Sequence, residues 1–77
     1  QWGIRSEDVA YAGERLRKLY DARSAVYVRE QIIQRIGGIG DQSSRDWLTA
    51  LRDDATQPAQ IQSAARSALQ FLDRPRR

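Results

Sequence analysis

The segment that most constrains this chain runs from residue 28 to residue 41 and reads VREQIIQRIGGIGD. Its apolar residues recur at steps of four, four and three, the spacing of one stripe along a helix: Val28, Ile32, Ile36 and Ile39. Gly37, Gly38 and Gly40 are expected to break this helix, because glycine readily adopts the positive φ of a sharp turn. Asp41 would then stand at the start of the next helix.

The same helical periodicity continues through the rest of the chain. No window alternates apolar and polar residues as a strand would, so the sequence predicts an all-α fold. Four helices are expected, at about residues 7–21, 25–36, 45–55 and 58–73. Ser6 is a candidate cap for the first helix, Ser43 or Ser44 for the third, and Pro58 suits the first turn of the fourth.

The two halves of the chain share one apolar pattern. The first helices align as Leu16, Leu19 and Asp21 with Leu48, Leu51 and Asp53. The second helices align as Val28, Ile32, Ile36 and Ile39 with Ile61, Ala65, Leu69 and Leu72, if the second inter-helix turn holds one extra residue. Each half is therefore a helix–turn–helix unit, and units that cannot bury their own apolar faces stack on one another.

This repeated unit resembles the short HEAT-like repeats of phycobilisome-lyase-type proteins. The residues that match are Val28, Arg29, Ile32, Ile36, Gly37, Ile39, Gly40 and Asp41, with Ile61 and Gln62 in place of Val-Arg in the second repeat. The resemblance implies one module of two stacked repeats, whose four helices form a short right-handed α-solenoid. Its expected parts are a lead-in (1–5), a first repeat (about 7–40), a second repeat (about 44–73) and a basic tail (74–77).

Length and composition exclude several classes of function. A chain of 77 residues holds one domain, and it has no cysteine for a disulfide or a zinc–thiolate site. It has no histidine either, which excludes Ser-His-Asp and Cys-His catalysis. We therefore expect no enzyme activity, cofactor or metal. No apolar run approaches the roughly 18 residues of a membrane span, and a cytoplasmic protein is favoured. Because no methionine begins the chain, an excised domain or processed form is expected.

The resemblance also suggests where a partner would bind, because the second helices of HEAT-like repeats line a concave face. The residues beside their apolar stripes are Glu30, Ile33 and Gln34, extended by Gly37, in the first repeat and Ser63, Arg66, Ser67 and Gln70 in the second. This face is polar and only mildly charged, whereas a nucleic-acid duplex requires a dense row of Lys and Arg. We therefore expect a protein or peptide partner, with an ordinary solvated face as the alternative.

Two other functions are compatible with the sequence. Residues 38–44 resemble the helix-hairpin-helix of DNA-binding proteins, in which backbone N–H groups hold a phosphate. Such a module would use the turn from Gly38 to Ser44 and the Arg-rich tail, although Asp41 would repel the phosphate. The third possibility is an accessory domain of a larger enzyme. The sequence leaves the oligomeric state open.

Overall fold

The computed structural model describes residues 6–74 as helices joined by short turns. The elements are α1 (Ser6–Leu19), α2 (Val26–Ile39), the 3-10 helix η1 (Gln42–Ser44), α3 (Arg45–Asp53) and α4 (Ala59–Leu72). No strand occurs in this range, which confirms the all-α prediction. The predicted lead-in, the Ser6 side-chain cap and the tail beyond Arg74 lie outside what the structure describes. Within residues 6–74, every helix is too short or too polar to traverse a lipid bilayer.

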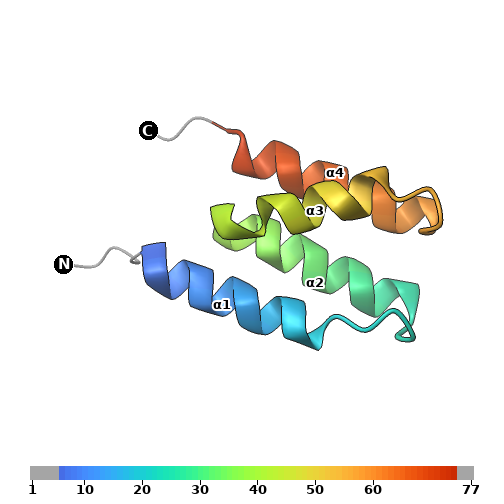
Figure 1. Cartoon of the computed structure of the whole chain (residues 1–77), viewed down its shortest axis with the longest axis horizontal. Helices are drawn as coiled ribbons and strands as arrows, with labels where there is room; N and C mark the ends of the chain where they lie inside the picture. Colours follow the sequence, from blue (N-terminus) through green and yellow to red (C-terminus); the bar gives the residue numbers. More distant parts are fainter. Residues whose placement is uncertain (1–5, 75–77) are drawn as a thin grey trace.

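The helices form two antiparallel hairpins that pack against each other. The α1–α2 and α3–α4 turns lie at one end of the molecule, and the α2–α3 connection lies at the other (Figure 1). α4 packs along both α2 and α3, and it supplies most of the buried core. The buried apolar residues are Ile33, Ile36, Leu48, Leu51, Ile61, Ala64, Ala65, Ala68, Leu69 and Leu72. Tyr20, just after α1, packs edge-to-face on Trp47 of α3 with 5.2 Å between the ring centroids, and this contact joins the two hairpins.

The apolar register of α2 differs from the predicted stripe. Ile33 and Ile36 are fully buried, whereas Val28, the expected start of the stripe, is 44% exposed. The reason is the position of α2, which contacts α1 on one side and α4 on another. A helix between two neighbours needs apolar residues on more than one face, so Ile33 belongs to the core and Ile32 is only partly buried against it.

The glycines near the end of α2 have separate roles. Gly37 and Gly38 lie inside the helix, contrary to the predicted break, and Gly40 alone has a positive φ, of 75°. The N–H of Gly40 donates to the Gly37 carbonyl and that of Asp41 to the Ile36 carbonyl, which is the Schellman arrangement at a helix end. Gly37 has a packing role, because a Cβ there would lie 2.8 Å from the Cβ of Ala68 and its absence lets α2 and α4 approach closely.

The turns of the two hairpins have the same hydrogen bonds at positions 33 residues apart. The Asp21 carboxylate accepts from the N–H of Arg23 at 2.9 Å, and the Asp54 carboxylate accepts from the N–H of Thr56 at 3.0 Å. Asp21 therefore corresponds to Asp54 and not, as predicted, to Asp53. The extra residue of the second half precedes this turn. α2 and α4 follow the turns with 14 residues each.

One long side chain in the first turn of α2 and one in the first turn of α4 each donate to a backbone carbonyl of the preceding turn. The Nε of Arg29 donates to the Ser24 carbonyl at 3.1 Å, and the amide nitrogen of Gln62 donates to the Asp54 carbonyl at 2.8 Å. Each long side chain thus ties its helix to the turn that precedes it. The two acceptors are not equivalent, because Ser24 lies 33 residues before Gln57 and not before Asp54.

Candidate functional site in the groove between α2 and α4

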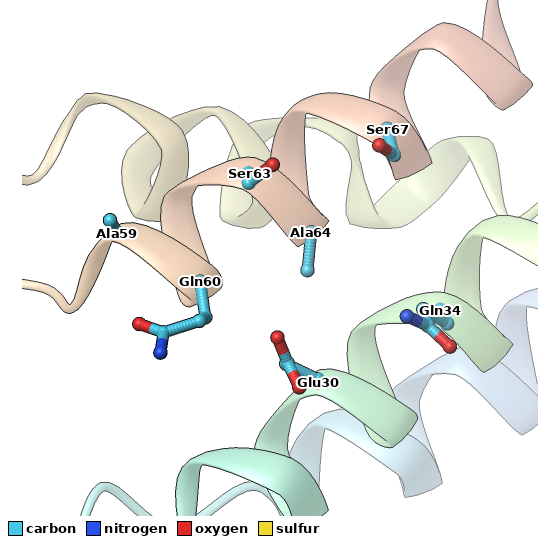
Figure 2. Close-up of a pocket in the computed structure, with 7 residues that line it drawn as sticks. All are labelled: Glu30, Gln34, Ala59, Gln60, Ser63, Ala64 and Ser67. Atoms are coloured by element: carbon cyan, nitrogen blue, oxygen red, sulfur yellow. The ribbon is translucent and has the colours of Figure 1, made fainter.

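A shallow groove lies between α2 and α4, where the two helices run side by side. It has a volume of about 410 Å³ and is open to solvent, and Figure 2 shows the residues that line it. Its lining residues come from both helices and are Glu30 and Gln34 of α2 and Ala59, Gln60, Ser63, Ala64 and Ser67 of α4. Glu30 and Gln60 face each other across the groove from opposite helices (Figure 2).

The groove continues toward the end of α4. A second hollow of about 170 Å³ is lined by Gln34, Gly37, Ser67, Ala68 and Phe71, so Gln34 and Ser67 belong to both hollows. This hollow is shallow, because the small residues Gly37 and Ala68 let the two helices approach closely beneath it. Phe71 is 51% exposed and gives this end an apolar wall. The two hollows form one groove that is polar at the Glu30 end and apolar at the Phe71 end.

Four of the seven residues predicted to bind a partner line this groove: Glu30, Gln34, Ser63 and Ser67. Ile33 was predicted to lie on the partner-binding surface, and this prediction was wrong, because its side chain is fully buried in the core. Arg66 and Gln70 are exposed on α4 but do not contribute to the lining.

Ala59, Gln60 and Ala64 also line the groove, although the sequence did not predict them. Gln60, Ser63 and Ser67 recur at steps of three and four, so the helical spacing that marked the serines would also have found Gln60. The alanines carry no polar group and give no such signal. Their small size leaves the space that the groove occupies.

The groove offers polar groups that have no partner of their own in the described part of the chain. The side chains of Gln34, Gln60, Ser63 and Ser67 make no hydrogen bond with residues 6–74. Glu30 is the only charged residue among those lining the described groove. The groove can therefore donate and accept several hydrogen bonds and can attract one cation.

The central turn, the alternative site, is arranged differently. Asp41 is 1% exposed, and its carboxylate accepts hydrogen bonds from the Ser43 backbone N–H at 3.1 Å, the Ser43 hydroxyl at 2.6 Å and the Ser44 hydroxyl. The Ser44 N–H donates to the Asp41 carbonyl. The two backbone N–H groups are donors that a helix-hairpin-helix would offer to a phosphate. Here these two N–H groups and the two hydroxyls all donate to Asp41, three to its carboxylate and the Ser44 N–H to its backbone carbonyl.

The carboxyl groups with perturbed pKa values lie at the end of α3 and in the α3–α4 turn, and not in the groove. The pKa of Asp54 is lowered by hydrogen bonds from the hydroxyl and N–H of Thr56 and from the Gln57 side chain. The pKa of Asp53 is lowered mainly by its hydrogen bond from Arg52. The Asp54 carboxylate accepts hydrogen bonds within the turn, whereas the Asp53 carboxylate pairs with its neighbour Arg52 on α3. In residues 6–74, no three His, Cys, Asp or Glu side chains cluster so as to hold a metal ion.

Comparison of the chain with protein-family models, curated proteins and solved structures gave no significant match. What the groove can bind is therefore inferred from its own residues. Their amides, hydroxyls and single carboxylate offer hydrogen bonds to a ligand, and the exposed ring of Phe71 offers an apolar contact.

Proposed function

We propose that this chain is a non-catalytic protein-interaction or scaffolding module, and that it binds a peptide segment of a protein partner in the α2–α4 groove. The observation that carries this proposal is the convergence of Glu30, Gln34, Ser63 and Ser67 on one groove. These residues come from two helices that are far apart in the sequence, and their polar groups are not used within the described fold.

The proposed architecture is two HEAT-like repeats. Its support comes from the hydrogen bonds that recur 33 residues apart in the turns at Asp21 and Asp54. The second helix of each hairpin has 14 residues, and these second helices pack directly against each other. In stacked repeats, neighbouring second helices present one continuous surface, and the proposed peptide site lies on that surface.

The groove residues suggest the chemistry of the bound peptide. Gln34, Gln60 and the two serines can hydrogen-bond to peptide backbone groups. Glu30 would pair with a Lys or Arg side chain, and the Phe71 end would hold an apolar side chain. The partner segment is thus expected to carry a basic residue and an apolar residue that lie along the two parts of the groove.

A nucleic acid is a poor match for the same groove. Its backbone is a row of negative charges, and specific or non-specific binding depends on neutralising them with Lys and Arg. Glu30, the single charged group of the lining, would repel a phosphate. The buried carboxylate of Asp41 has the same effect at the central turn.

The proposal is tested by selecting binders from a library of short random peptides displayed on phage, with the whole chain as bait. Enriched peptides are expected to contain a basic and an apolar residue, and their affinities would be measured by fluorescence anisotropy. Gln34→Trp should weaken binding by at least about tenfold, because a bulky ring would fill both hollows.

The matched control is Gln31→Trp. Gln31 is also an exposed glutamine of α2, but it lines neither hollow. This variant should bind the selected peptides as the unchanged chain does. Equal losses in the two variants, or a selection that enriches no peptide, would contradict the proposed site.

A further inference from the structure

A second groove lies between α1 and α2, on a side of α2 that faces away from α4. It encloses about 350 Å³ and is lined by Ala12, Arg15, Leu16, Leu19, Arg35 and Ile39. Each residue of a helix is turned by about 100° from the one before it. Arg35 therefore lies about 100° around α2 from Gln34 and about 160° from Gly37, two residues of the first groove. The two grooves are therefore separate surfaces of the same helix.

The floor of this α1–α2 groove is apolar and incompletely covered. Leu19 is 68% exposed, and Leu16 and Ile39 are half-buried. α1 packs on α2 less extensively than α4 does, so a strip between α1 and α2 remains open to solvent within the described residues. Contiguous exposed apolar surface with a polar rim is a feature of interaction sites.

The rims of the groove are basic. Arg15 projects from α1 and Arg35 from α2, and no carboxylate is among the lining residues. In the described chain, the Arg15 guanidinium has only Tyr11 as a partner, with 3.2 Å to its hydroxyl, and Arg35 has no ion pair. The nearby Glu14 is already paired with Lys18 at 3.5 Å. The two arginines are thus available to an acidic ligand on either side of the apolar floor.

We propose that the α1–α2 groove docks an amphipathic helix of a protein partner, with apolar residues on one face and Asp or Glu along both edges of that face. A groove between two antiparallel helices accommodates the apolar ridge of a third helix. The lining spans Ala12 to Leu19 on α1, a rise of about 10 Å, so the docked helix needs two to three turns. Its acidic edges pair with Arg15 and Arg35.

A second copy of this chain fits the groove less well. In a two-fold dimer the same patch appears on both subunits, so the contact brings Arg15 and Arg35 of one copy toward those of the other. Like charges that face each other oppose such an interface. Charge complementarity therefore selects an acidic helix over self-association.

The test uses two synthetic helical probes that differ only in charge. The acidic probe carries Leu residues at positions i, i+3 and i+7, flanked by Glu, and the basic probe has Lys in place of each Glu. Fluorescence anisotropy with the whole chain should show binding of the acidic probe, weaker at higher salt because the rim charges are screened. The basic probe should bind at least about fivefold more weakly.

Variants locate the probe and separate charge from apolar contact. Leu19→Gln should lose most of the acidic-probe affinity, whereas Tyr27→Gln, a substitution of another side chain that is 68% exposed, should keep it. Arg35→Glu should weaken the acidic probe by at least about fivefold and improve the basic one, and the same change at exposed Arg66 should do neither.

Three results would overturn this proposal. They are absence of acidic-probe binding, equal binding of both probes, and concentration-dependent dimerisation in analytical ultracentrifugation that Leu19→Gln abolishes. The third would identify a second copy as the occupant. None of them bears on the α2–α4 groove, which Leu19→Gln leaves intact.

Discussion

Replacing Gly13 by alanine should destabilise the fold, although alanine is the better helix former. A Cβ at Gly13 would lie 1.6 Å from Oδ2 and 2.4 Å from Cγ of Asp41. This carboxylate is short, buried and held by Ser43 and Ser44, so it has little freedom to move. Either the carboxylate leaves its hydrogen bonds or α1 moves away from η1.

The magnitude follows from these two routes. Hydrogen bonds to a charged group contribute about 1.5 kcal/mol each, so displacing the carboxylate costs on the order of 4 kcal/mol. Moving α1 is overpacking, which costs up to about 3 kcal/mol, and the depth of the overlap favours the upper end. The cheaper route dominates, and helix propensity returns about 1 kcal/mol. The free energy of unfolding should therefore fall by about 2 kcal/mol.

Gly38→Ala is the matched control, since it makes the same chemical change inside another helix. A Cβ at Gly38 has no neighbour within 4 Å, so only helix propensity acts. Stability should rise by about 0.5 to 1 kcal/mol. Urea unfolding followed by circular dichroism at 222 nm, roughly the helical minimum, measures both variants, and an unchanged m-value would show that the change is in stability.

The Asp41→Ala background isolates the contact itself. Without the carboxylate, Gly13→Ala should lose its steric penalty and keep only the gain in helix propensity, so the double-mutant cycle should give a coupling of about 3 kcal/mol. If Gly13→Ala instead stabilises the chain as Gly38→Ala does, α1 does not rest on the Asp41 side chain and this reasoning is refuted.

Three further predictions concern the core, a helix end and a turn. Ile33→Ala should cost about 2 to 5 kcal/mol and Val28→Ala less than about 1 kcal/mol in urea unfolding, because Ile33 is 0% and Val28 44% exposed; equal costs would contradict the register of α2. Gly40→Ala should cost about 1 kcal/mol in the same assay, because φ is 75° there, and an unchanged midpoint would oppose the left-handed cap. The hydrogen bonds from Thr56 lower the pKa of Asp54, so NMR should show that this carboxyl titrates below its usual range. Its stabilising effect should be lost as the pH falls through that lowered pKa. Thr56→Val should raise the pKa of Asp54 toward its usual range.

Local spacing was enough to predict the helices. The apolar periodicity located four helices within a few residues of their observed ends, and Gly40 and Pro58 mark real boundaries. The spacing could not show which neighbours each helix has. Ile32 and Ile33 are both apolar, and only the position of α2 between α1 and α4 decides that Ile33 is the more buried.

The sequence also could not predict close contacts between residues that are far apart along the chain. Glycine is a poor helix former, yet Gly37 lies inside α2, where the absence of a Cβ leaves room for Ala68 of α4. Gly13 carries no motif, and its role depends on Asp41 lying over it. Such contacts depend on tertiary packing, which overrides local propensity.

The binding face was predicted in part for the same reason. Ser63 and Ser67 were found because they are polar and one helical turn apart on α4. Arg66, one residue before Ser67, points elsewhere, so the width of the face was overestimated. The α1–α2 groove had no sequence signal, because its floor combines residues that periodicity assigns to two helix cores.

The most direct measurement of the proposed function is an NMR titration of the isotope-labelled chain with a peptide enriched by the library selection. Binding in the α2–α4 groove predicts that the backbone amides of Gln34, Ser63 and Ser67 shift together and saturate at one peptide concentration. Shifts confined to residues 38–44, or to the α1–α2 groove around Leu19, would contradict the assignment of the peptide site to α2 and α4.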